Sequence, residues 1–191
     1  MRIAPLPLTA LLTLTTLLMG ARTSGVPQST SAPEAPVPPE GRLTRLYAAD
    51  PVICALDLRS GAPGMVVIDG EVFNRESHLA MGFAPDSLAV GVQGRDEGTI
   101  VDLGSLREVA IELGRPVQGN GGNAYAAIDA DWARPRLEAL PMQSIATARI
   151  QVGHVYLMRV TDGSDRDLLA KLLVLEHQPS ASVTLRWKRL Q

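Results

Sequence analysis

From residue 42 onward the chain is a succession of short apolar runs that Gly, Pro, Asn and Asp interrupt. Runs of this length and spacing are typical of β-strands in a sandwich or barrel, and not of alternating strand–helix units. Residues 44–49 fit one helical turn, and residues 168–176 fit either a strand or a helix. The sequence therefore predicts an all-β fold, an antiparallel β-sandwich with few or no helices. The predicted strands cover residues 52–58, 65–69, 79–83, 88–92, 99–103, 107–113, 145–151, 155–161, 168–176 and 182–189.

The last three of these runs predict a C-terminal three-stranded antiparallel meander. Asp162 and Gly163 mark its first turn, and residues 178–180 mark its second. In the final run, apolar residues 183, 185 and 187 alternate with polar residues 184, 186 and 188. This alternation predicts a strand with one packed face and one wet face. A shared core is expected for Leu56, Leu58, Val67, Val90, Ile100, Leu157, Leu172, Val174, Leu185 and Trp187.

The residues before this region predict export. Arg2, an apolar stretch over residues 8–19 and the small residues that follow have the order of a secretory signal peptide, which we expect over residues 1–25. The apolar stretch is shorter than the roughly 20 residues that cross a bilayer, and no membrane span is expected after cleavage. Residues 26–41, rich in Pro and Ser, predict an extended linker. A single sandwich domain is expected over residues 42–191, in a secreted or periplasmic location.

Charge and cysteine content exclude several classes of protein. The 18 basic and 20 acidic side chains give a formal net charge of −2, so there is no basic excess to attract nucleic acid. Cys54 is the single cysteine of the sequence, which excludes an internal disulfide framework and a Cys-rich metal site. Cys54 lies within an apolar run, where a core thiol is expected.

The histidines are the candidates for binding a cofactor. His78, His154 and His177 are too far apart in sequence to form a local metal-binding motif, so no metal site is predicted. His78 lies close to Met81, and both side-chain types can ligate haem iron. The four residues are therefore the candidate ligands if haem is bound. The alternative is that each histidine is a polar residue at the start or end of a strand.

Carboxylates suggest two other sites, each with a plainer alternative. Asp162, Asp165 and Asp167 offer oxygen ligands for calcium, but they also suit a soluble hairpin turn. Asp129 and Asp131 lie next to Trp132, and a pair of carboxylates beside an aromatic residue suits a sugar-cleaving site. On one face of a strand, however, the two would lie closer together than glycosidase carboxylates do.

No catalytic residue is predicted from the remaining motifs. The serines that follow Gly104 and Gly163 lack the second glycine of a nucleophile elbow. The glycine-rich residues 118–123 lack the Lys-Ser/Thr that completes a phosphate-binding loop, and no helix is predicted after them. A surface loop is the expected structure for this stretch.

Three segments carry a resemblance to a known family. Residues 153–163, 170–174 and 183–187 follow the order of a strand with a Thr–Asp–Gly turn, a "YAKL"-type strand and a closing aromatic strand. Residues 55–61 add an early strand of the "FDF…G" type, with Leu56 and Leu58 at the aromatic positions. In these segments the chain resembles HmuY-like proteins. The resemblance implies an exported all-β fold and, by extension, haem carriage between axial side chains that are mostly histidines.

Three functions follow as hypotheses, the third being a hydrolase that uses Asp129 or Asp131. The first is an exported, non-catalytic β-sandwich that serves as a binding or structural module of the cell envelope, with another envelope or secreted protein as its partner. The alternative is a haem carrier that uses His78, Met81, His154 or His177. The cofactor is otherwise unknown.

Overall fold

The computed structural model describes residues 40–191, except residues 75, 83, 94–95, 118–121 and 162–166. The predicted signal peptide and the linker up to residue 39 lie outside the described residues, as do most of the glycine-rich loop and the turn at Asp162 and Gly163. The described elements are β1 (Arg42–Tyr47), β2 (Ala55–Leu56), β3 (Met65–Ile68), β4 (Glu71–Asn74), β5 (Leu79–Met81), β6 (Ser87–Val90), β7 (Glu97–Ser105), α1 (Leu106–Glu112), α2 (Gly122–Ala127), α3 (Ala130–Glu138), β8 (Ala146–Arg149), β9 (His154–Thr161), β10 (Asp167–Gln178) and β11 (Ser182–Arg189).

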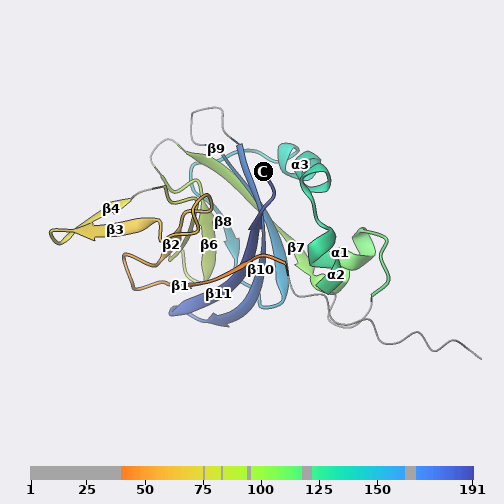
Figure 1. Cartoon of the computed structure of the whole chain (residues 1–191), viewed down its shortest axis with the longest axis horizontal. Helices are drawn as coiled ribbons and strands as arrows, with labels where there is room; N and C mark the ends of the chain where they lie inside the picture. Colours follow the sequence, from red (N-terminus) through yellow and green to blue (C-terminus); the bar gives the residue numbers. More distant parts are fainter. Residues whose placement is uncertain (1–39, 75, 83, 94–95, 118–121, 162–166) are drawn as a thin grey trace, which may run out of the picture. The chain divides into compact units, whose positions relative to one another are not determined.

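Two antiparallel sheets confirm the sandwich prediction (Figure 1). The larger sheet has the strand order β1-β11-β10-β9-β7, and the smaller has the order β2-β5-β6-β8. Strands β3 and β4 form a separate hairpin. The predicted C-terminal meander is present, because β10 pairs with β9 on one side and with β11 on the other.

The three helices lie on one side of the large sheet (Figure 1), so its central strands β9 and β10 are buried on both faces. One face packs against the small sheet through residues such as Tyr156, Leu172 and Trp187. The opposite face packs against the helices through Leu157 and Leu169. This explains the nearly continuous apolar run in β10, which reads as strand or helix equally well. No helix in the described part of the chain is long and apolar enough to cross a membrane.

The helical layer corrects three sequence predictions. Residues 107–113, predicted as a strand, form α1, whose N-terminus carries a capping box between Ser105 and Glu108. That Ser-x-x-Glu spacing was visible in the sequence and is a recognised helix start. Helix α2 occupies residues for which no helix was predicted. Asp129 caps α3 by accepting a hydrogen bond from Trp132 N at 2.9 Å, so Asp129 and Asp131 do not lie on a strand.

The first half of the domain contains three further differences. Residues 44–49 were predicted as a helical turn, but most of them belong to strand β1, which pairs with β11. The strand predicted over 52–58 is reduced to Ala55–Leu56. Strand β4 was not predicted, although Asp69 and Gly70, with φ of 51° and 83°, are the residues that a tight hairpin turn prefers.

Most of the predicted core is confirmed. Seven of its residues lie in the cluster between the sheets, and Ile100 packs against that cluster. Leu157 is buried in the other cluster, beneath the helices, because it alternates with Tyr156 and Met158 along β9. The side chain of Val67 lies outside the described ones. The seven are Leu56, Leu58, Val90, Leu172, Val174, Leu185 and Trp187.

Candidate functional site

Each histidine singled out by the sequence lies beside an aspartate from a distant part of the chain. The sequence did not suggest these pairs, because the partners are brought together by sheet pairing and turns and not by local spacing. The pairs are His78 with Asp57 at 3.1 Å, His154 with Asp102 at 3.0 Å, and His177 with Asp86 at 3.2 Å.

His78 and Met81 are interior residues. The residue exposures are 2% for His78 and 3% for Met81, and Met81 belongs to the core between the sheets. His78 Nδ1 accepts a hydrogen bond from Leu58 N at 3.2 Å. The imidazole therefore supports the turn that follows β2, as a structural histidine does.

Asp57 organises the same turn and borders an open cleft of about 580 Å³. Its carboxylate accepts hydrogen bonds from Arg59 N at 2.7 Å and from Ser60 Oγ at 2.5 Å. Burial opposes ionisation of Asp57, but the hydrogen bonds from Ser60 and Arg59, with His78 adding to them, lower its pKa below the usual value. Both carboxylate oxygens of Asp57 are thus hydrogen-bonded within the turn.

His177 is held more loosely by its aspartate. Its Nε2 lies 3.2 Å from Asp86 Oδ1 but is not aligned for a hydrogen bond, whereas Ser180 N donates to the same oxygen at 2.7 Å. Met81 and Asp86 line one open pocket of about 300 Å³. Of the four haem candidates, Met81 lines this pocket, and His177 lies beside Asp86, which also lines it.

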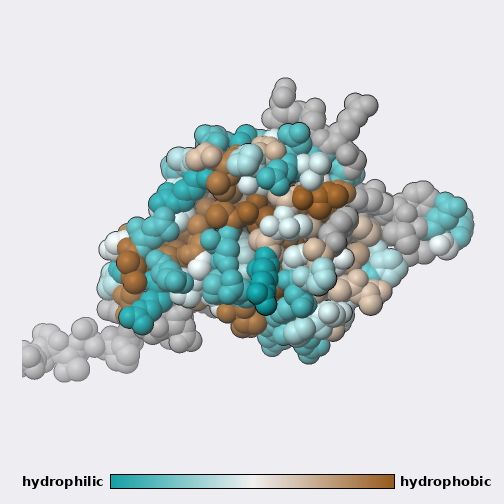
Figure 2. Space-filling view, turned by 180° about the vertical axis from the view of Figure 1, so that it is seen from behind, coloured by the Kyte–Doolittle hydropathy of each residue, from teal (hydrophilic) through white to brown (hydrophobic). Residues whose placement is uncertain are grey.

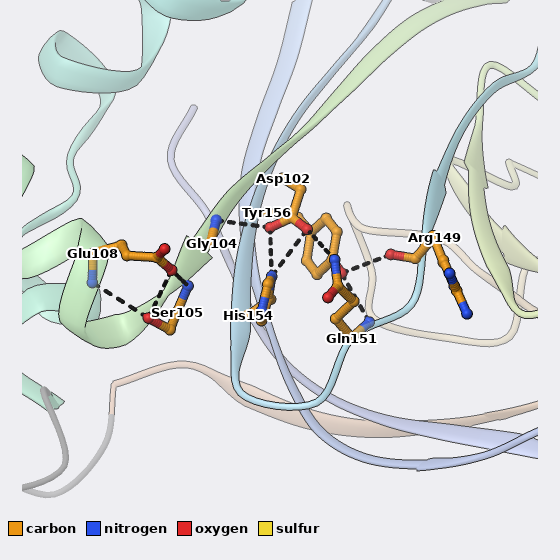
Figure 3. A network of polar contacts seen from close by, with 8 residues as sticks. All are labelled: Asp102, Gly104, Ser105, Glu108, Arg149, Gln151, His154 and Tyr156. Atoms are coloured by element: carbon orange, nitrogen blue, oxygen red, sulfur yellow. Dashed lines mark hydrogen bonds and ion pairs between the residues drawn. The ribbon is translucent and has the colours of Figure 1, made fainter.

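The Asp102–His154 pair has the most exposed imidazole of the three and is the candidate functional site (Figure 3). His154 Nδ1 lies 3.0 Å from each carboxylate oxygen of Asp102. Gly104 N at 2.7 Å and Gln151 Nε2 at 3.1 Å donate to the same carboxylate. A carboxylate at Nδ1 favours the tautomer that carries its proton there, so Nε2 is left as an acceptor. The side chain of His154 is 24% exposed.

Tyr156 fixes the loop that precedes His154. Its hydroxyl donates to Arg149 O at 2.7 Å and accepts from Gln151 N at 3.0 Å (Figure 3). Burial, with Asp102 nearby, raises the pKa of Tyr156 to about 12, so the hydroxyl keeps its proton at neutral pH. The loop and the carboxylate together hold the imidazole in one orientation.

Ser105 lies opposite His154 in the pairing of β7 with β9, after a bulge. Its hydroxyl donates to Glu108 Oε2 at 2.8 Å and accepts from Glu108 N at 3.4 Å, as a helix cap. The backbone and hydroxyl of Ser105, with a smaller effect of His154, lower the pKa of Glu108. Serine, histidine and aspartate are therefore neighbours, but the hydroxyl is hydrogen-bonded to Glu108 and does not present its proton to the imidazole.

The described residues include no group of three or more His, Cys, Asp or Glu side chains that could hold a metal ion. Asp167, the described member of the calcium candidates, accepts from Arg159 Nη2 at 2.8 Å and from Arg159 Nε at 3.1 Å. Burial raises the pKa of the Cys54 thiol, which lies 3.7 Å from Met65 Sδ. The thiol therefore keeps its proton at neutral pH, and a protonated thiol is a poor nucleophile and a poor metal ligand.

A haem titration tests the four candidate ligands. We expect no sharp Soret band that saturates at one equivalent, because His78 and Met81 are interior residues and the other imidazoles lie beside carboxylates. The measurement is visible absorption of the purified protein with haemin, beside His154→Ala and His177→Ala variants. A saturable band that one of these variants loses would instead establish the haem carrier.

Lys171 is a buried charge that sequence reasoning missed. It lies in the middle of β10 with 0% exposure, on the face that the helices cover. Its Nζ donates to Tyr125 O at 2.6 Å, to Ile128 O at 2.8 Å and to Ala126 O at 3.3 Å. These carbonyls lie at the C-terminal end of α2, where a cation satisfies the acceptors that a helix leaves unpaired.

Glu40 adds a carboxylate to this cation. Its Oε2 lies 3.5 Å from Lys171 Nζ, and its Oε1 pairs with Lys188. The chain's two lysines thus share one carboxylate, from a residue that the sequence placed in the linker. Burial lowers the pKa of Lys171 to about 8, and Asp129 offsets part of this effect.

The lowered pKa of Lys171 predicts that stability rises with pH. Between about pH 8 and the ordinary lysine value near 10.4, the unfolded chain binds more protons than the folded chain. We expect the free energy of unfolding to increase by about 2–3 kcal/mol from pH 8 to pH 10 through this group, and to be flat below pH 8. Urea titrations at several pH values measure it, and Lys171→Met should abolish the rise. An unchanged rise in that variant would assign it to another group.

Comparison with known proteins was made at three levels. Protein-family models, curated proteins and solved structures all give no match to this chain. The HmuY-like resemblance therefore stays a prediction, and the chemistry of the site rests on the geometry of its own residues.

Proposed function

We propose that the chain is an exported, non-catalytic binding module of the cell envelope. One observation carries the proposal: the Asp102–His154 pair holds an imidazole rigidly at the sheet margin, while the neighbouring Ser105 hydroxyl is committed to Glu108. A nucleophile must present its proton to a base before acyl transfer can begin. An oriented imidazole whose side chain is 24% exposed instead suits hydrogen bonding to a partner.

The surface supports a partner of mixed polarity. On the face shown in Figure 2, apolar residues form separate areas bordered by polar ones. Single exposed apolar residues are ordinary on protein surfaces, so hydrophobic area alone does not identify the partner. Val152, two residues before His154 in the sequence, is 57% exposed and offers an apolar side chain to a partner.

Binding to isolated envelope material tests the proposal. The purified protein should sediment with envelope from the cells that produce it, saturably and in competition with unlabelled protein. His154→Ala should weaken this binding. Arg115→Ala, which replaces an exposed residue that follows α1, should leave the binding unchanged. Cell fractionation should place the chain outside the cytoplasm. Absence of saturable binding, or a cytoplasmic location, would overturn the proposal.

A further inference from the structure

A small pocket at the start of β1 and the end of β11 carries an unusual concentration of positive charge. Its volume is about 160 Å³, and its lining includes the side chains of Arg42, Arg59, Lys188 and Arg189 beside Trp187. None of the described lining residues is acidic. The whole chain has a net charge of −2, so this positive charge is a local feature and not a property of the entire surface.

Arg42 is held in position within this pocket. Its Nη1 donates to Ser60 O at 2.7 Å, and its guanidinium lies 5.6 Å from the centre of the Trp187 ring. Gly61 makes this position possible, because a Cβ there would lie 2.3 Å from Nη1 and the residue has φ of +79°. A guanidinium fixed in this way loses less conformational entropy on binding a ligand.

Carboxylates neutralise two of the four cations. Lys188 pairs with Glu40, and Arg59 lies 3.7 Å from Glu76, whose side chain is 60% exposed. The fixed contact of Arg42 is to a neutral carbonyl oxygen. Arg189 has no ion-pair partner within the described part of the chain. Arg42 and Arg189 thus line one small pocket, and neither has an ion-pair partner among the described residues, so an anion bound there would be attracted to both.

We infer that this pocket binds one small oxyanion, a phosphate or sulfate group. Convergent arginines present several donors in a planar fork that matches the oxygens of such a group. A volume of about 160 Å³ is large enough to admit one such group. The inference rests on this pocket alone and does not require the proposed envelope function.

Calorimetric titration of the purified protein with inorganic phosphate, at constant ionic strength and pH 7.5, tests the inference. Saturable binding at one equivalent is expected. Arg42→Gln should raise Kd by about tenfold or more, since it removes a charge-assisted hydrogen bond. Arg189→Gln, at an exposed residue, should raise Kd several-fold without affecting folding. Arg107→Gln removes the same charge from α1 and should leave Kd unchanged.

The outcomes separate clearly. The inference would be overturned if neither phosphate nor sulfate gave a saturable heat of binding. It would also be overturned if Arg107→Gln and Arg189→Gln raised Kd equally, because that result would indicate general attraction between charges. Glycerol 1-phosphate distinguishes the source of the group. If glycerol 1-phosphate binds as tightly as phosphate, the natural ligand is a phosphate group carried on a larger molecule. If it does not bind, the natural ligand is the free anion. Thermal unfolding of each variant confirms that it is folded.

Discussion

Replacing Trp187 by alanine is expected to lower the free energy of unfolding by about 3–5 kcal/mol. Trp187 is 2% exposed and lies on β11 between Arg42 of β1 and Leu172 of β10. Its ring belongs to the core between the two sheets, and its Nε1 donates to Thr44 Oγ1 at 2.9 Å. Truncation would leave a cavity between the two sheets and remove that hydrogen bond.

Urea titration of Trp187→Ala measures this loss, with Trp132→Ala as the matched control. Trp132 lies on α3, is only partly buried and has Arg136 stacked 3.6 Å from its ring centre. Its truncation should cost less, because part of the ring is already in water. If Trp187→Ala is too unstable to purify, Trp187→Phe should show a smaller loss of the same sign. A cost for Trp187 no larger than that for Trp132 would contradict the packing described.

Replacing Lys171 by alanine is expected to cost about 3–5 kcal/mol, because it removes one partner from a buried polar cluster. Three backbone carbonyls at the end of α2 would lose their donor, and Glu40 would lose one of its two lysines. A cavity would also open between β10 and the helices. The helical layer should therefore loosen before the sheets do.

Lys171→Met separates the polar contribution from the packing contribution. Methionine fills most of the same volume but donates no hydrogen bond, so we expect a loss of about 1–3 kcal/mol. Amide hydrogen exchange should show the largest change in α2, at residues 124–127, and little change in β5 and β6. Equal losses for Lys171→Ala and Lys171→Met would mean that the cavity contributes nothing. A stabilising effect of Lys171→Met would show that burial of the charge outweighs its hydrogen bonds.

Strands in which apolar and polar residues alternate were predictable, because one of their faces is exposed to solvent. In β11, residues 183, 185 and 187 are buried and the residues between them are not, as their polarity indicates. In β10 the polarity pattern does not indicate which face is buried, because both are. Leu168 packs between the sheets, and Leu169 packs beneath the helices. The helices are short, and α1 was misread as a strand because Val109, Ala110 and Ile111 suit either structure.

The candidate site was less predictable, because it depends on register. The sequence gives no reason to join Asp102 to His154, which lie 52 residues apart. The pairing of Asp102 with Tyr156 and of Ser105 with His154 brings them together across β7 and β9. The role of Lys171 was not predictable for a similar reason. A lysine inside an apolar run gives no sign of being buried, because the backbone carbonyls near the end of α2 that accept its hydrogen bonds are brought to it only by the fold.

The pairing of β1 with β11 also has a mechanical consequence. Arg42, at the start of β1, lies opposite Trp187, near the end of β11, so the two strand ends lie at the same end of the pair. A force that pulls residues 42 and 189 apart would load the hydrogen bonds of this pair one after another and not all at once. Such peeling requires much less force than sliding the strands past each other. A chain anchored before residue 42 and strained beyond residue 189 would therefore open first at β1, which carries Arg42 of the pocket proposed to bind an oxyanion.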